Sequence, residues 1–421
     1  MVVAAAALTL AACSSTNSST SSTTSASSHT SGPPASAMTD HTGVTATSIH
    51  VANISTLNLG GLFKGAVVGA EAYFDMVNAR GGVHGRKIYV DSGDDQFEGS
   101  DNLQLTQSAI DNDLAIVGSF SLEDSYGGTL LAKNPGMPDI SNVLDLPTEK
   151  LPNVYSAVPL QGGWEEGAIQ YFIHKFPQDA GKAAAMVADE PSSVAAWQGE
   201  KYVLQKVGFH VLYAPTFPPS QTDYTQNVVT MKNMGIKIVF LEQMPEEYAG
   251  AFIKDLVQQN YHPQIVFGAA AYSSQLVSSS GGAADIDGAL LEQNASLYLG
   301  QDASDLPADA TFLHWVNVAD PGFNTDLFTL YGWLNAQLFT EALQNAGSDP
   351  SRGSLLEALS KITSFNGDNL VTTSDPAAKT TSNCYLIGEI ANGDFQRLGD
   401  PPISGPTNGY RCDYQYVTPP S

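Results

Sequence analysis

Strand patterns and helix patterns alternate along residues 48–290, and this alternation is the strongest constraint on the fold. Residues 48–55, SIHVANIS, carry the β-branched residues typical of a strand. In the next segment Ala66, Ala70 and Phe74 recur at helical spacing, so one face of a helix is apolar. Gly81 supplies a left-handed helix end before a second strand pattern, RKIYVDS. A repeated strand–helix order predicts parallel sheets with helices on both faces.

The alternation occurs twice. The first unit closes with the strand pattern MPDIS at residues 137–141, and a second unit begins with KAAAMVAD at residues 182–189. After about residue 290 the order changes. GALLEQNASLYL is predicted as one long strand, helices follow, and CYLIGEIANGDFQRL is predicted as a hairpin with an Asn-Gly turn. The pattern therefore indicates an α/β protein with two doubly wound units.

The N-terminus indicates export. Residues 1–13, MVVAAAALTLAAC, are apolar, too short to span a bilayer and typical of a signal peptide. LAAC resembles a bacterial lipobox, which implies that Cys13 is acylated and anchors the protein to a lipid bilayer. The Ser/Thr-rich residues 14–42 are predicted as a disordered tether. The alternative is an ordinary signal peptide with an incidental cysteine. No Lys or Arg precedes the apolar run, a departure that a start upstream of Met1 would explain.

Charge and cysteine content narrow the classes of partner. The chain has 43 acidic and 18 basic residues, a formal net charge of −25, which argues against binding to nucleic acid or anionic lipid headgroups. Cys384 and Cys412 form an even pair in an exported chain, so we expect a disulfide worth roughly 3–4 kcal/mol in the chain-entropy model. Neither cysteine has a histidine or second cysteine at metal-ligand spacing, so no metal site is expected.

Sequence signatures of enzymes are absent. The chain has no Gly-x-Ser-x-Gly elbow, no His-Glu-x-x-His motif and no Walker loop. Asp94 and Asp95 follow a strand, where ligands bind in open α/β sheets, but aspartate is also a common turn and helix-capping residue, and the structural interpretation is preferred. The glycine-rich residues 118–128 suit a neutral or zwitterionic ligand better than a phosphate. We expect no catalytic residues and no cofactor.

The segment KGAVVGAEAYFDMVNARGGVHGRKIYVDSGDD carries a family resemblance. It resembles the first helix and second strand of branched-chain amino-acid-binding proteins, the type I periplasmic binding proteins of ABC importers. AIVGSFS is similar to that family's third strand and first ligand loop. TDYTQNVVTMKNMGIKIVFLEQMPEE is similar to a helix–strand unit of its second lobe. In that family the aspartate pair belongs to the framework of the lobe.

The resemblance implies two doubly wound α/β lobes joined by three crossovers. Lobe one would comprise residues 45–160 plus 295–368, and lobe two residues 161–294 plus 369–421. A small-molecule ligand would bind between the lobes, and hinge closure would be recognised by the permease subunits of an ABC transporter. The lipid anchor would hold the protein on the outer face of the cytoplasmic membrane.

The same resemblance implies candidate ligand-binding positions. The family's first-loop serine falls at Leu122, its second-loop threonine at Asp145 and its lobe-two acid at Ala270, a pattern that disfavours the usual α-amino-acid pose. The ligand is expected to be a small polar organic molecule. Seven residues are predicted to contact it: Asn58, Ser121, Asp145, Trp164, Ser193, Gln243 and Tyr272.

Two other functions are compatible with the sequence. A ligand-sensing receptor would share the fold but report to a regulatory partner, such as a kinase, instead of a permease. An exported hydrolase is the third interpretation, and the missing catalytic motifs disfavour it.

Overall fold

The computed structural model describes residues 32–420 apart from Leu59 and Pro219. The predicted signal peptide, the anchor Cys13 and the tether as far as residue 31 lie outside the described residues. Residues 33–421 form one compact unit by backbone contacts. No described helix is long and apolar enough to cross a membrane.

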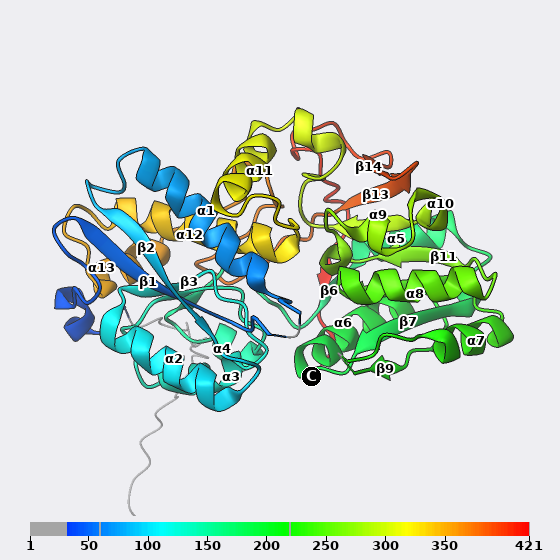
Figure 1. Ribbon diagram of the computed structural model, residues 1–421, viewed down its shortest axis with the longest axis horizontal. Coiled ribbons are helices and arrows are strands. Elements are labelled where there is room, and N and C mark those ends of the chain that lie inside the picture. Colours follow the sequence, from blue (N-terminus) through cyan, green and yellow to red (C-terminus); the bar gives the residue numbers. More distant parts are fainter. Residues whose placement is uncertain (1–31, 59, 219, 421) are drawn as a thin grey trace, which may run out of the picture. The chain divides into compact units, whose positions relative to one another are not determined.

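The first sheet has five parallel strands in the order β2-β1-β3-β4-β5, of which the first three are labelled in Figure 1. Ile49 and Val51 point to the face that α1 and α12 cover, whereas Ala52 and Ile54 point to the face covered by α2 and α3. Two apolar faces on one strand are what helices on both sides of a sheet require. The elements are β1 (Ser48–Ser55), α1 (Lys64–Ala79), β2 (Lys87–Asp94), α2 (Gly99–Asn112), β3 (Ala115–Val117), α3 (Asp124–Leu131), β4 (Asp139–Ile140), α4 (Leu146–Glu149), β5 (Val154–Tyr155), α11 (Pro307–Ala319), α12 (Leu327–Asn345) and α13 (Arg352–Leu359).

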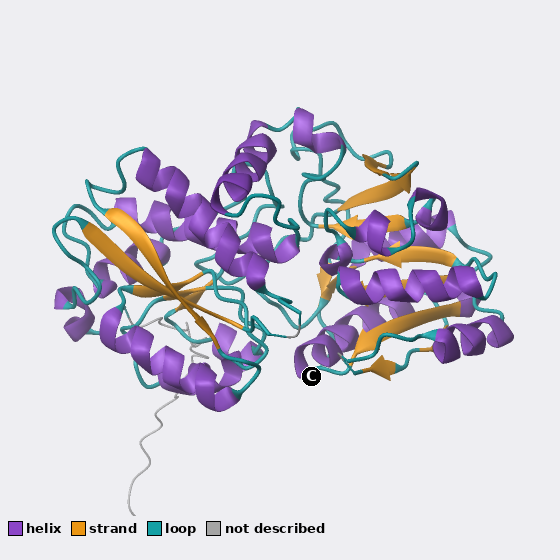
Figure 2. Cartoon of the chain, in the orientation of Figure 1, coloured by secondary structure: helices purple, strands orange, loops and turns teal. Residues whose placement is uncertain are grey.

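The second sheet has eight strands (Figure 2). Its main order is β14-β13-β12-β11-β10-β7-β8, with β9 also paired to β7; β7 to β12 are parallel, and β13 and β14 are antiparallel. Along β7, Ala183 and Ala185 pack towards α5 and α6, and Ala184 and Met186 towards α7 and α8. The elements are α5 (Glu166–Lys175), β7 (Ala183–Ala188), α6 (Pro191–Val207), β8 (Val211–Tyr213), β9 (Thr216–Phe217), α7 (Thr225–Met234), β10 (Ile238–Gln243), α8 (Glu246–Gln258), β11 (Gln264–Phe267), α9 (Leu276–Ser279), α10 (Ala283–Ile286), β12 (Leu290–Gln293), β13 (Leu386–Ala391) and β14 (Asp394–Arg397).

Local turn chemistry follows the sequence patterns. Gly81 after α1 and Gly235 after α7 have φ of 103° and 65°, which glycine adopts without steric cost. Asn392 and Gly393 connect β13 and β14 with φ of 54° and 87°, as an Asn-Gly hairpin turn requires. The predicted helix end at Gly81 and the predicted Asn-Gly turn both agree with the structure.

Two sequence-based expectations need correction. The long strand predicted from GALLEQNASLYL is only β12, Leu290–Gln293, because the chain then crosses back to the first sheet. The last part of the predicted tether is folded, since Ala35–Thr39 form a 3₁₀ helix in which Ala37 is buried. Asp40 also forms an ion pair with Arg352, at 3.0 Å between nitrogen and oxygen, which holds this segment against α13.

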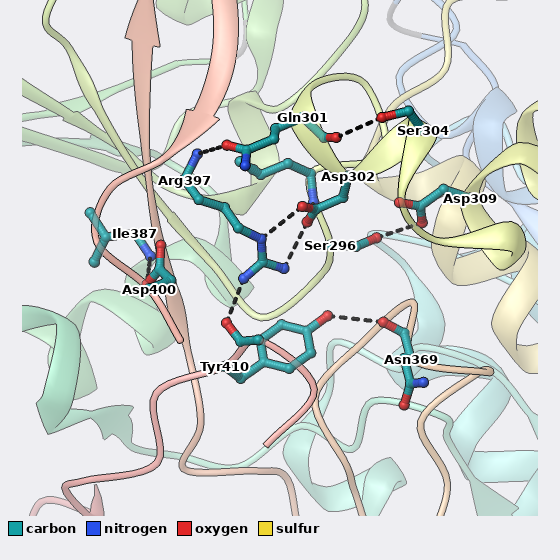
Figure 3. Close-up of polar contacts among 12 residues, drawn as sticks. Ser296, Gln301, Asp302, Ser304, Asp309, Asn369, Ile387, Arg397, Asp400 and Tyr410 are labelled. Carbon is teal, nitrogen blue, oxygen red and sulfur yellow. Dashed lines mark hydrogen bonds and ion pairs between the residues drawn. The ribbon is translucent and has the colours of Figure 1, made fainter. Parts of the chain in front are cut away.

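A buried polar network holds the crossovers and the C-terminal tail together (Figure 3). Both Asp302 carboxylate oxygens accept hydrogen bonds from Arg397, at 2.7 Å each, and the two side chains are 0% and 7% exposed. The Arg397 guanidinium also lies 5.8 Å from the ring centroid of Tyr410, whose hydroxyl donates to the Asn369 carbonyl at 3.2 Å. One arginine thus connects β14, the segment after β12, the segment after α13 and the tail.

The disulfide expected between Cys384 and Cys412 is present in the structure, with an S–S distance of 2.06 Å. It ties the start of β13 to a tail that otherwise has little regular structure. Near the end of this tail, β15 (Tyr416–Val417) pairs with β6 (Trp164–Glu165) in a separate antiparallel ribbon.

Helices α1 and α12 pack closely because glycines face the opposite backbone. A Cβ atom on Gly69 would lie 1.9 Å from the Thr329 carbonyl oxygen. One on Gly332 would lie 2.1 Å from the Ala66 carbonyl oxygen. Real Cβ atoms do not approach backbone so closely, so the helix separation depends on these glycines.

We expect Gly332→Ala to destabilise the protein by about 1–3 kcal/mol, because the new methyl group must push α1 and α12 apart. Helix propensity alone predicts that the substitution stabilises the protein, since alanine in a helix is favoured over glycine by about 1 kcal/mol. Thermal unfolding measures the difference. Gly181→Ala is the matched control, because a Cβ there meets nothing within 4 Å. Equal melting temperatures for both variants would contradict the packing argument.

Burial of acids beside β4 makes stability depend on pH. Burial raises the pKa of Asp139 to about 7 and that of Glu149 to about 8, although the charge of Lys379 lowers both. In the unfolded chain these groups titrate near pH 4. Between about pH 4 and 7 the folded state therefore holds protons that the unfolded state has lost, so the free energy of unfolding falls as pH rises.

We expect the melting temperature to increase when pH is lowered from 8 to 5. Asp139→Asn removes one titrating group while keeping the side-chain shape, so its pH profile should be flatter than that of the native protein. Scanning calorimetry at four pH values tests both statements. A native melting temperature that falls towards pH 5, or two parallel profiles, would refute the assignment.

Candidate functional site

A cavity of about 310 Å³ lies where strands of both sheets end. Leu62 follows β1, Phe120 follows β3 and Val158 follows β5 in the first sheet. Glu190 follows β7 and Ala270 follows β11 in the second sheet. Ligands of open α/β sheets bind beyond the carboxyl ends of parallel strands, so the topology and the cavity indicate the same place.

The wall on the first-sheet side is apolar. The rings of Phe63, Phe120 and Phe328, which we call the aromatic wall, contact one another with centroid separations of 4.6, 4.7 and 4.9 Å. Leu122 and Leu144 pack against this cluster and also line the cavity. Phe63 is the N-cap of α1, and Phe328 lies in the first turn of α12, so two helix starts position the rings.

The wall on the second-sheet side carries the charge. Glu165, Glu190 and Glu292, which we call the acidic wall, line the cavity from β6, the start of α6 and β12. Burial raises the pKa of Glu165, and a hydrogen bond with the Glu292 carboxyl lowers it. Burial also raises the pKa of Glu190. Burial thus disfavours the charged forms of the Glu165 and Glu190 carboxyls.

Polar groups of other kinds complete the lining. The Trp164 indole Nε1 is buried and has no hydrogen-bond partner in the described part of the chain. Tyr331 and Asn294 are also lining residues, and burial raises the pKa of Tyr331. No Lys, Arg or His is found among the described residues that line the cavity.

The C-terminal tail forms part of this site. The Tyr416 hydroxyl lies 2.8 Å from each of the carbonyl oxygens of Gln161 and Gly163 and is itself a lining residue. Tyr416 and Val417 pair with Glu165 and Trp164 across the small ribbon. The tail therefore positions two cavity residues through backbone hydrogen bonds.

The sequence-predicted ligand residues separate into three groups. Trp164 and Ser193 line the cavity. The Gln243 side chain lies outside the described part of the structure, although Pro245, two residues further on, is in the lining. The remaining four are not part of the lining.

Local contacts account for the positions of these four side chains outside the lining. Asn58 donates from its side chain to the Gln96 carbonyl at 2.6 Å. Ser121 is buried and donates to Asp95. Asp145 caps α4 by accepting from the Thr148 amide at 3.0 Å. Tyr272 is fully buried against Tyr298 and Phe395 and accepts a hydrogen bond from the Leu299 amide at 2.8 Å.

The aspartates at the end of β2, Asp94 and Asp95, have framework contacts. Asp94 accepts hydrogen bonds from the amides of Leu57 and Gln96, both at 2.9 Å. Asp95 is fully buried and accepts from Thr56 at 2.8 Å and from Asn102 at 3.1 Å. These contacts agree with the structural interpretation. Within the described residues, no group of three or more His, Cys, Asp or Glu side chains is arranged to hold a metal.

Two positions of the family overlay, Leu122 and Ala270, are lining residues of the cavity. Sequence reasoning missed the aromatic wall, the acidic wall and Tyr416. Glu190 and Glu292 lie at strand ends, so the rule for parallel sheets was a usable signal for them. Tyr416 had no such signal, because its position depends on the fold of the tail.

Comparison with known sequences identifies the family. Residues 50–394 match the family model described as periplasmic binding protein. Leu/Ile/Val-binding protein homolog 1 of Brucella suis biovar 1 is 24% identical over 285 residues, covering 67% of this chain and 73% of that protein. Homolog 7 of Brucella melitensis biotype 1 is 25% identical over 222 residues, 49% of this chain. That match spans about half (54%) of the relative's length.

Solved structures show the same fold. A fatty acid ABC transporter substrate-binding protein from Thermomonospora curvata has a TM-score of 0.71 at 17% identity, covering 91% of this chain and 95% of that one. A branched-chain amino acid ABC transporter protein from Thermus thermophilus with bound valine has a TM-score of 0.73 at 13% identity, covering 84% and 96%. Since the family match extends over most of the chain, this protein belongs to the periplasmic binding protein family.

Proposed function

We propose that this protein is the extracytoplasmic solute-binding component of an ABC importer. The cavity with walls from both sheets is the observation that carries the proposal. The Thermomonospora and Thermus neighbours are described as ABC transporter proteins, and the Brucella relatives are named Leu/Ile/Val-binding homologues, which supports the same function here. The protein binds its ligand without converting it.

The two sheets correspond to the lobes that close on the ligand. We assign residues 45–160 plus 295–368 to the first lobe and 161–294 plus 369–421 to the second, with the three crossovers acting as the hinge. Two contacts support a compact hinge. Ser374 donates to the Ala157 carbonyl at 2.7 Å, and Lys379 donates to the Leu151 carbonyl at 2.8 Å, so the third crossover lies against the first.

Acylation of Cys13 would keep the receptor on the outer face of the cytoplasmic membrane, beside its permease. The apolar run before Cys13 and the Ser/Thr-rich residues after it support this placement. The folded segment from residue 35 onward shortens the tether relative to the 14–42 expected from composition.

We expect Ser193→Trp to abolish ligand binding while leaving the protein folded, because an indole on this wall fills much of the cavity. The readout is the set of small molecules that the purified protein retains from a metabolite extract, identified by mass spectrometry after denaturation. Ser278→Trp is the matched control, because Ser278 is exposed and outside the lining. Retention of the same molecules by Ser193→Trp would refute the cavity as the binding site.

The tail contact gives a second prediction. Tyr416→Phe removes the hydroxyl that bonds to Gln161 and Gly163, so we expect the affinity for a retained molecule to fall about 5–10-fold, corresponding to about 1 kcal/mol per hydrogen bond. Titration calorimetry measures the change. Tyr414→Phe is the control, because the Tyr414 hydroxyl has no hydrogen bond to another described residue. Equal affinities in the two variants would show that the tail does not position the site.

A further inference from the structure

We propose that the ligand is an apolar amine, meaning a molecule with an aromatic or aliphatic body and a protonated amino group. The inference rests on the proposed function of the cavity as the ligand site. It follows from the different chemistry of the two walls and from the contacts already made by the backbone amides of the ligand loops.

The acidic wall determines the charge of the ligand. Glu165, Glu190 and Glu292 line a cavity that has no basic side chain among its described lining residues. A carboxylate ligand would face like charges on buried acids, where the repulsion is poorly screened. A cation would instead offset charges that the fold has partly desolvated, so the wall favours a positively charged group.

The backbone donors beside the aromatic wall are already used. The Leu122 amide donates to the Thr56 hydroxyl at 3.1 Å, and the Leu144 amide donates to Asp124. The Glu123 amide donates to the Ser121 hydroxyl at 2.9 Å. None of these three amides is therefore free to donate to a carboxylate of the ligand. The result agrees with the altered positions in the family overlay, where a leucine and an aspartate replace hydroxyl residues.

The Glu165–Glu292 pair is suited to an ammonium group. Both carboxyls line the cavity, and Glu292 is only 3% exposed. An ammonium group has three donors and no acceptor, so it can donate to more than one carboxylate at once. The neighbouring Trp164 Nε1, which lacks a partner in the described chain, adds a place for one acceptor such as a ligand hydroxyl or carbonyl.

The aromatic wall determines the body of the ligand. Three phenylalanine rings in mutual contact, extended by Leu122 and Leu144, present a continuous apolar surface opposite the acids. Burial of an apolar group against such a surface contributes roughly 25 cal/mol per Å² removed from water. A small hydrophilic cation would forgo this contribution. A cavity of about 310 Å³ accommodates a single-ring or short-chain amine.

Four probes of matched shape test the ligand class with the full-length chain. They are 2-phenylethylamine, 2-phenylethanol, phenylacetate and methylamine, measured by titration calorimetry and thermal shift at pH 7.5. We expect 2-phenylethylamine to bind at least tenfold more tightly than 2-phenylethanol. Phenylacetate should give no shift because of its charge, and methylamine none because it lacks the apolar body.

Variants locate the effect. Glu292→Gln and, as a second variant in case the first does not fold, Glu165→Gln should reduce the preference for the amine over the alcohol to less than threefold, because the amine loses affinity. Glu357→Gln is the control, because Glu357 is exposed and pairs only with Lys361 among the described residues. An unchanged preference in the cavity variants would overturn the proposed role of the acidic wall.

The outcomes separate this inference from the proposed function. Binding of phenylacetate or 2-phenylethanol that equals or exceeds amine binding, and that Ser193→Trp abolishes, overturns the amine class but leaves the cavity as the ligand site. Absence of a shift with 2-phenylethylamine also overturns the class. Amine binding that persists in Ser193→Trp places the ligand elsewhere and contradicts both proposals.

Discussion

The buried ion pair between Arg397 and Asp302 is the interaction on which the arrangement of hinge and site depends. Two 2.7 Å hydrogen bonds in a nearly inaccessible position satisfy both charges, and desolvation makes the loss of either partner costly. The same guanidinium bonds to the Gly409 carbonyl and lies over Tyr410, so the C-terminal tail is held to the segment after β12. Together with the disulfide and the pairing of β15 with β6, this attachment holds Tyr416 beside the cavity.

The two walls of the cavity are dissimilar because different kinds of structure build them. On the side of the first sheet, helix starts and strand-end loops present side chains whose backbone polar groups bond locally, so the surface left over is apolar. The wall on the side of the second sheet is a strand end, a helix start and a two-residue ribbon, which bring carboxyls together. Neither wall can satisfy an amphipathic ligand alone. Such a ligand would therefore bind the closed state more tightly than the open state, because only closure brings both walls against it.

Sequence patterns predicted the architecture well and the cavity poorly, for separable physical reasons. Alternation and glycine ends depend on local geometry, so the parallel sheets, Gly81, Gly235 and the Asn-Gly hairpin could be read directly. Site residues depend on which neighbour a side chain reaches. Ser121 and Asp145 lie in the expected loops, but each bonds within its own lobe and leaves an adjacent leucine facing the cavity. A shift of one residue exchanges polar for apolar lining, and no pattern in a single sequence resolves it.

Charge connects the composition of the chain to its site. A formal charge of −25 creates a field that attracts cations, but salt screens surface charges beyond about 10 Å. Carboxyls in a desolvated cavity are screened far less, so selectivity resides there and not in the surface. Burial raises the pKa of Glu165 and of Glu190, so the charged forms of these acids are costly in the empty site. A cationic head beside the acidic wall offsets that cost, so the burial of the acids itself favours a positively charged ligand.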